Sequence, residues 1–467
     1  MNKLLDSIAA AISECGLKSG MTISFHHHLR NGDHVLNMVM EAIAASGLRD
    51  ISINASSLFD VHAPLINHIK SGVVTSLECG YMSGRLAAAI SEGVLSTPVV
   101  FRSHGGRPAA LAAHESCIDV AFIAAPTADT MGNCSGKYGK SACGSLGYAF
   151  ADAQYAKRVV VITDNLVAYP LADFSIDETH VDYVVAVDSI GDPAGIISGT
   201  TNITRDPIGL IMAAYAARIM DAADLIKDGM SFQTGAGGAS LATAKYLKDI
   251  MVQRNIRGSF GLGGITGYLV DMLEENCFES LLDVQCFDLR AVESIRTNPR
   301  HREISAMQYA SPTSKSAAVD HLDVVILGAT QIDTDFNVNV HTDSNGYIIG
   351  GSGGHSDAAA GASLTMIIAP LTRARLSIVV DHVGCISTPG SSIDVLVTQH
   401  GIAVNPAKAD LALRLKDAGL PVMDIFALKE AAQQLTGIPQ PISLGERIVA
   451  NVFYRDGTQI DSIRCVK

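Results

Sequence analysis

The segment Ser231-Phe-Gln-Thr-Gly-Ala-Gly-Gly-Ala-Ser-Leu241 predicts a sharp turn between a buried strand and a helix. Residues 229–232 lead into it as a short apolar run, and residues 239–252 carry apolar side chains at helical spacing. Its glycines lack Cβ atoms, so a ligand can approach the backbone amides closely, and the helix N-terminus adds partial positive charge. A turn of this kind suits a phosphate, a carboxylate or the oxyanion of an acyl-transfer intermediate.

The same turn is a poor match to a dinucleotide-binding site. Ser240 stands where the third glycine of that motif belongs, and no Asp or Glu closes the strand predicted at 259–262. A tight strand–helix turn that binds no ligand stays open as an alternative on this evidence alone.

Composition limits the class of protein. The chain has 467 residues, a net charge of −13, 42 glycines and no tryptophan. The charge disfavours nucleic acid or an anionic membrane as a partner, and the apolar, glycine-rich composition is typical of an α/β protein. Nine cysteines without framework or zinc-ligand spacing indicate reduced thiols and no metal site. Because the sequence has no signal-peptide pattern and no apolar run long enough to span a membrane, we expect a cytoplasmic protein.

Short apolar runs alternate with helical segments, which predicts βαβ units and a mainly parallel sheet. Three segments of the first half recur in the same order in the second half, about 210 residues later. The matching segments are 18–23 with 227–232, 119–129 with 323–333, and 181–185 with 393–397. We therefore predict two related α/β domains, 1–215 and 216–467, with the active site in the cleft between them.

Two groups in the first half are candidates for ligand contacts. The histidines at 26–28 hold the position that the glycine turn holds in the second half. Ligand contact or local packing explains them better than a metal does, because no carboxylate-rich motif stands beside them. Arg102, His104 and Arg107 surround a Gly-Gly turn and could receive a polycarboxylate, since arginine binds carboxylate in a bidentate fork. A solvated surface turn is the alternative.

A glycine-rich segment at 350–361 brings backbone close to two titratable groups. Gly353 and Gly354 precede His355 and Asp357, although Asp357 could instead cap the helix that follows.

Another segment, 133–147, is rich in glycine and lysine but lacks P-loop spacing. Its cysteines, Cys134 and Cys143, are interpreted as packed small residues in preference to nucleophiles.

Together these motifs resemble the CoA-transferase superfamily and, within it, the citrate lyase alpha subunits. The resemblance covers essentially the whole chain and rests on residues 24–28, 102–107, 139–149, 232–242, 263–267, 336–340, 353–355, 388–390 and 401–406. It implies two CoA-transferase-type domains and an acyl exchange. In that reaction an acetyl thioester on the acyl carrier (gamma) subunit is exchanged for citrate, which gives citryl thioester and acetate. A separate beta subunit, the lyase, then cleaves the citryl group within an oligomeric complex.

The resemblance also implies site residues. It places the thioester and its oxyanion at Gln233, Gly235, Gly237, Gly238, Gly263 and Gly264, the citrate carboxylates at Arg102, His104 and Arg107, and the carrier or CoA at Gly353, Gly354, His355 and Asp357. No cofactor is permanently bound; the substrate is the carrier's CoA-like group (phosphoribosyl-dephospho-CoA), with CoA as a surrogate.

The identity of a catalytic side chain stays open. CoA-transferases that form a glutamyl thioester use a Glu in the turn equivalent to Gly263-Gly264, and this chain has none there. It also has Gln331 where the family usually has Glu, a departure that could lower or change the activity.

Two other functions compete with this interpretation. An acetate CoA-transferase or acyl-CoA hydrolase on the same fold would require the missing Glu. A non-catalytic scaffold subunit of a lyase complex would require no active site.

Overall fold

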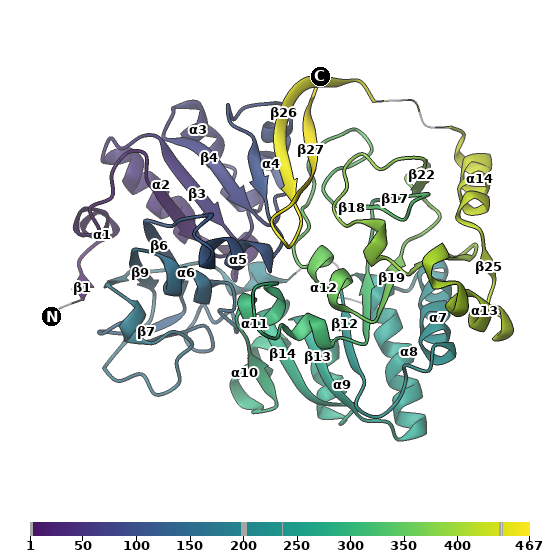
Figure 1. Cartoon of the computed structure of the whole chain (residues 1–467). Helices are drawn as coiled ribbons and strands as arrows, with labels where there is room; N and C mark the ends of the chain where they lie inside the picture. The colour runs from purple at the N-terminus through teal and green to yellow at the C-terminus, as the bar shows by residue number, and fades with distance from the viewer. Residues whose placement is uncertain (1–2, 198–202, 236, 439, 441) are drawn as a thin grey trace.

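Two α/β halves lie side by side in the computed structural model, which describes residues 3–197, 203–235, 237–438, 440 and 442–467 (Figure 1). Each half is built on one large sheet. Buried aliphatic side chains of the strands and of the helices that cover them form the core, as expected for mainly parallel sheets covered on both faces.

The first sheet has ten strands, and all neighbours are parallel except the last two. Their order across the sheet is β1 (Leu4–Leu5), β11 (Tyr183–Ala186), β9 (Arg158–Thr163), β6 (Val120–Ala125), β2 (Thr22–Phe25), β3 (Ile51–Ala55), β4 (Val74–Cys79), β5 (Val99–Phe101), β26 (Leu444–Phe453) and β27 (Gln459–Val466).

The second sheet has nine strands, with only β23 and β24 antiparallel. Their order is β15 (His301–Glu303), β14 (Phe278–Cys286), β13 (Gly258–Ile265), β12 (Ser231–Thr234), β16 (Val324–Leu327), β19 (Leu364–Ile368), β23 (Val395–Val397), β24 (Ile402–Val404) and β25 (Val422–Met423).

The two sheets repeat one topology. The order β11-β9-β6-β2-β3-β4-β5 corresponds to β23-β19-β16-β12-β13-β14-β15. Equivalent hydrogen bonds accompany it: the backbone N–H of Thr22 donates to Asp119 Oδ2 at 2.8 Å, and that of Ser231 donates to Asp323 Oδ2 at 2.8 Å. The predicted duplication and the mainly parallel α/β fold are therefore confirmed.

Helices and smaller sheets complete each half. The helices of the first half are α1 (Ile8–Glu14), α2 (Val35–Ala45), α3 (Leu65–Lys70), α4 (Gly84–Ser91), α5 (Gly106–Ala112) and α6 (Ala149–Tyr155). Those that follow are α7 (Pro207–Ala222), α8 (Gly238–Arg254), α9 (Gly267–Glu274), α10 (Leu289–Thr297), α11 (Ala306–Ala310), α12 (His355–Gly361), α13 (Ala409–Asp417) and α14 (Ile425–Thr436). The small sheets are β10-β7-β8 (Leu166–Val167, Thr127–Asp129, Cys134–Ser135), β18-β17-β22 (Val338–Asn339, Gln331–Asp333, Val379–Val380) and β20-β21 (Thr372–Arg373, Leu376–Ser377).

The end of the chain returns to the first half. Strand β26 pairs in parallel with β5, so the β26–β27 hairpin extends the first sheet and lies between the halves (Figure 1). The sequence prediction placed these residues in the second domain because strand partners far apart in the chain leave no local signal. The predicted boundary between residues 215 and 216 falls inside α7, which packs on α8, and it stays a prediction.

Within the described ranges, no helix is long and apolar enough to cross a membrane.

Candidate active site

A cavity of about 770 Å³ opens between the two halves. The first half supplies side chains from the loops after its strands, among them His27, Tyr81 and His104. The second half supplies the turn after β12 and the segment 349–355. The cavity thus lies at the carboxyl ends of parallel strands in both sheets, the usual ligand position in α/β proteins.

The glycine turn forms one wall of the cavity. Helix α8 begins at Gly238, and its N-cap Gly237 has no side chain to bond the first N–H groups, which have no partner inside a helix. Gly235, Gly237 and Gly238 all line the cavity, but the Gly235 N–H donates to the Ile326 carbonyl at 3.0 Å. The α8 terminus, and not Gly235, therefore offers the amides for an oxyanion; Ala236 lies outside the described residues.

Steric crowding explains the missing glutamate at Gly263 and Gly264. Gly263 has a φ of +104°, a conformation that suits glycine, and a Cβ there would lie 3.0 Å from the Gln233 side chain. A Cβ on Gly264 would lie 2.2 Å from the ring of Phe287. Gly264 lines the cavity, whereas Gly263 does not. Phe287 thus occupies the space through which a side chain at position 264 would leave the backbone.

Gln233, at the end of β12, connects the glycine turn to Tyr309, which lines another part of the cavity. Its Nε2 donates to the Tyr309 hydroxyl at 2.9 Å, while its buried Oε1 has no partner among the described residues. Both side chains line the cavity. Burial raises the pKa of Tyr309, so its hydroxyl stays protonated at neutral pH.

Histidines in the first half line the cavity as neutral groups. His27 and His104 pack with Tyr148, with ring centroids 4.6 and 4.4 Å from it. Burial lowers the pKa of His104 to about 3 and that of His27 well below its ordinary value. His26 and His28 are buried against each other and do not line the cavity. Two of the three adjacent histidines therefore serve packing.

The predicted carboxylate receivers are separated by the fold. His104 lines the cavity, but Arg102 and Arg107 do not. Arg102 Nε lies 3.2 Å from Glu78 Oε1. Arg107 is buried, and its guanidinium bonds to an asparagine and to the carboxylate of Asp152, with Nη1 2.6 Å from Asp152 Oδ1. This arrangement does not support the citrate-binding role predicted for these two arginines, which stays a prediction, because each one's charge is already paired inside the first half.

The glycine segment 350–354 packs against the first half as well as lining the cavity. The His104 N–H donates to the Gly353 carbonyl at 2.7 Å, and a Cβ on Gly354 would lie 2.5 Å from the Tyr309 hydroxyl. His355 lines the cavity with both nitrogens occupied, Nε2 donating to the Gly328 carbonyl at 2.9 Å. Burial lowers the pKa of His355 to about 4, so it is a neutral, fixed group.

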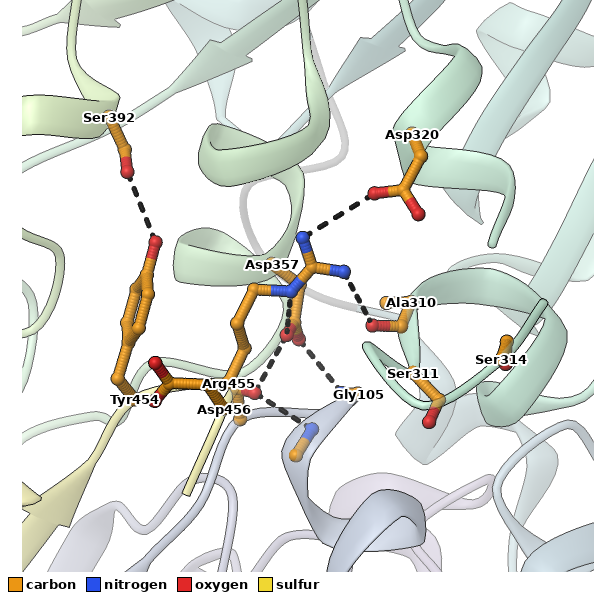
Figure 2. A network of polar contacts seen from close by, with 12 residues as sticks. Gly105, Ala310, Ser311, Ser314, Asp320, Asp357, Ser392, Tyr454, Arg455 and Asp456 are labelled. Atoms are coloured by element: carbon orange, nitrogen blue, oxygen red, sulfur yellow. Dashed lines mark hydrogen bonds and ion pairs between the residues drawn. The ribbon is translucent and has the colours of Figure 1, made fainter. Parts of the chain in front are cut away.

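Asp357 points away from the cavity. Its carboxylate accepts hydrogen bonds from Ser103 Oγ at 2.7 Å and from the Gly105 N–H at 2.8 Å. Figure 2 shows it between the Gly105 backbone and Arg455 of the C-terminal hairpin, whose Nε lies 3.9 Å away. Burial raises the pKa of Asp357 to about 6. The predicted contact of Asp357 with the carrier does not fit this position; its carboxylate holds the Ser103 hydroxyl and the Gly105 backbone, on either side of His104.

Sequence reasoning missed the two cations of the cavity, Arg30 and Arg373. Arg373 is exposed on β20. Within the described part of the chain, no Asp, Glu, Lys or Cys lines the cavity. In the sequence, only the position of Arg30 next to the histidines at 26–28 pointed to a role. The aromatic rings that contact it belong to Phe59 and Phe287, which are distant in the sequence.

Other candidates lie elsewhere. Cys134 and Cys143 are buried, and burial raises the pKa of both thiols, so they are packed residues as predicted. Gln331 does not line the cavity. In the described ranges no group of three or more His, Cys, Asp or Glu side chains is arranged to hold a metal ion.

The duplicated α/β halves and the cavity between them define a protein with the CoA-transferase type of fold. The structure is similar to a malonate decarboxylase alpha subunit from Acinetobacter baumannii, with a TM-score of 0.72 at 16% identity over 94% of this chain and 93% of that one. At this level of identity the similarity concerns the fold alone.

Sequence comparison identifies the family. The model of the citrate lyase alpha subunit family (CitF) matches residues 1–466. The citrate lyase alpha chain of Klebsiella pneumoniae is 51% identical over 465 residues, which are 100% of this chain and 92% of the relative. The alpha subunit of citrate lyase from Streptococcus mutans, solved in complex with citrate, has a TM-score of 0.98 at 50% identity, over 100% of this chain and 92% of that one. The chain belongs to the citrate lyase alpha subunit family.

Proposed function

We propose that this chain exchanges the acetyl group of an acyl carrier thioester for citrate, giving citryl thioester and acetate. The observation that carries the proposal is the charge of the cavity: it is lined by two guanidinium groups and, in the described ranges, by no carboxylate. Such a cavity favours an anionic acid and offers no enzyme carboxylate as a nucleophile. The citrate-bound relative from Streptococcus mutans supports citrate as that acid.

The substrate itself supplies the nucleophile. A citrate carboxylate, ionised at neutral pH, attacks the thioester carbonyl; a C–O bond forms, and the C–S bond breaks to release thiolate. The thiolate then attacks the citryl carbonyl of the mixed anhydride, forming a new C–S bond and expelling acetate. No proton moves, which agrees with the neutral state of His27, His104 and His355.

Backbone groups stabilise the charge that develops on oxygen. The N–H groups at the start of α8, around Gly237 and Gly238, suit the oxyanion in both additions. Gln233 is placed beside them by the hydrogen bond from its Nε2 to the Tyr309 hydroxyl. Gly264 lines the same cavity.

The proposal also covers the partner subunits of the chain and its cellular compartment. The acyl donor is the CoA-like group of a gamma (carrier) subunit, and a beta (lyase) subunit consumes the citryl product. Gly353, Gly354 and His355 line the cavity in a position to contact that group. All nine cysteines are free, which fits a reducing compartment such as the cytoplasm.

Mixing the purified chain with acetylated carrier, or acetyl-CoA as a surrogate, and citrate tests this function. Mass spectrometry is expected to show citryl thioester, with citrate preferred over acetate and malate. A folded chain that gives no product with either donor would overturn the proposal. Hydroxylamine treatment during turnover is expected to leave every enzyme carboxylate unmodified; a hydroxamate on a Glu or Asp would favour the CoA-transferase alternative.

A further inference from the structure

Arg30 is a partly buried cation, and no charged side chain of the described residues pairs with it. Its Cζ lies 5.1 Å from the ring centroid of Phe59 and 5.1 Å from that of Phe287. No side chain in the described ranges forms an ion pair or a hydrogen bond with its guanidinium. The nearby buried arginines differ: Arg107 is paired with Asp152, and Arg102 with a glutamate.

The donors of this guanidinium are accessible from the cavity, so an anion can reach them. Contacts with aromatic rings compensate a guanidinium in part but occupy none of its five N–H donors. Burying a charge without hydrogen-bonded compensation destabilises a protein, and such groups are normally paired. The fork of donors on Arg30 matches an oxyanion that binds in two places, such as a carboxylate.

The backbone holds Arg30 in a fixed, unusual conformation. Its φ is +51°, which is rare for a residue with a side chain. The turn is locked on one side by Gly32, where a Cβ would lie 1.9 Å from the Asp192 carbonyl. On the other side Asp33 accepts a hydrogen bond from the N–H of Val35 at 3.1 Å. Strain of this kind persists where the surroundings impose it, and it is concentrated at functional sites.

The position of Arg30 is also tied to the second half. Gln285 Nε2 donates to the His27 carbonyl at 2.9 Å, which joins β14 to the turn that carries Arg30. Phe287, which contacts Arg30, is the ring that fills the space beside Gly264. Arg30 therefore lies near Gly264, in the cavity that the start of α8 also lines.

We propose that Arg30 is the specificity-determining residue that binds a carboxylate of the acid substrate beside the reacting thioester. This inference rests on the proposed transferase function and names the residue that recognises its acid. A phosphate of the donor would have the same chemistry, but Arg30 is partly buried between two aromatic rings whereas Arg373 is exposed. A small acid can reach Arg30. The phosphates of the donor lie at the opposite end of the pantetheine arm from the thiol, so they fit the exposed Arg373.

The variants Arg30→Gln and Arg30→Lys test this, with Arg85→Gln as the matched control. Arg85 is a surface arginine whose side chain is 71% exposed and paired with Asp60. We expect Arg30→Gln to raise the KM and the calorimetric Kd for citrate about 10- to 100-fold, since a charge-assisted pair is lost. Arg30→Lys should recover part of that loss, and the KM for acetyl-CoA should stay within about twofold. Arg85→Gln should leave all three constants unchanged.

The outcomes separate the two proposals. If the parent chain binds and transfers citrate and Arg30→Gln, folded by circular dichroism, binds citrate equally well, the role of Arg30 is refuted and the transferase stands. A rise in the KM for acetyl-CoA alone would assign Arg30 to a phosphate and also refute it. If the parent chain neither binds citrate in calorimetry nor forms product, the transferase itself fails.

Discussion

Gln331 is a position at which we expect this chain to depart from its family, and its contacts define what such a departure changes. Its Oε1 accepts hydrogen bonds from Asn339 Nδ2 at 3.0 Å and from the Gly384 N–H at 3.0 Å, within the small sheet that contains β17. A glutamate would accept from the same two donors. We therefore expect Gln331→Glu to keep kcat and the KM for citrate within about twofold of the parent values, measured by steady-state exchange. A tenfold change in either constant would show that this position acts on the reaction.

Candidate site residues could be predicted from the sequence where the site is formed by the backbone of one short segment. They could not be predicted where a side chain's role depends on contacts with residues distant in the sequence. The glycine turn, its helix and the lack of a nucleophile at Gly264 could be inferred because a short segment of sequence contains them. The pairing of Arg102 and Arg107 with Glu78 and Asp152 could not, since the partners are brought together only by the fold. For the same reason a surface-like arginine at position 30 gave no sign of its two aromatic neighbours.

At the scale of elements, the β26–β27 hairpin contacts the second half, and Arg455 is one of the side chains that do so. Arg455, just beyond β26, donates from Nη2 to the Ala310 carbonyl at 3.2 Å and lies 3.9 Å from Asp357 (Figure 2). We expect Arg455→Ala to lower the free energy of unfolding by about 2 kcal/mol in urea titrations, because a buried carboxylate loses its cation.

The matched control for this change is Arg254→Ala. Arg254 also makes a two-bond pair, with Asp221, but on the surface. Exposed ion pairs contribute little to the free energy of unfolding, so Arg254→Ala should lower it much less than Arg455→Ala does. Equal losses for the two variants would show that the hairpin contact is no more than a surface pair.

The alternation of strands and helices gave the element types because periodic apolar patterns are local. Helix α2 occupies the predicted residues 35–45, and α8 exceeds its predicted range by one residue at its start and two at its end. The sequence did not predict that the hairpin joins the first sheet. Its pairing with β5 joins residues about 350 positions apart, and a local sequence pattern does not identify such distant strand partners.

The whole molecule should be sensitive to acid. Burial lowers the pKa of His26 and His355 to about 4, and of His104 and His341 to about 3. In the unfolded chain these groups bind protons near pH 6.5, so the unfolded state gains protons that the folded state refuses as the pH falls from 7 toward 4. Asp357 and Glu303 act in the opposite sense, because burial raises the pKa of each carboxyl group and so favours the folded state on acidification, but they are fewer than the histidines with lowered pKa values.

Thermal unfolding followed between pH 7.5 and 5 should therefore show a Tm that falls by about 5 °C or more. His341→Gln should reduce that dependence, since His341 is buried outside the cavity with Nδ1 bonded to Ser387 Oγ at 2.6 Å. A Tm that stays constant or rises on acidification would contradict the neutral state of these histidines.

The return of β26 to the first sheet has a consequence for how the protein is made. The ribosome delivers residues 444–453 only after the whole second half, so until then β5 has an open edge with unsatisfied hydrogen-bonding groups. Domains usually fold in the order in which they emerge, but here the first sheet remains incomplete while the second is synthesised. The edge of β5 is therefore open to wrong strand pairing from the synthesis of residue 101 until residue 444, which is most of the translation of the chain, and pairing with β26 closes it.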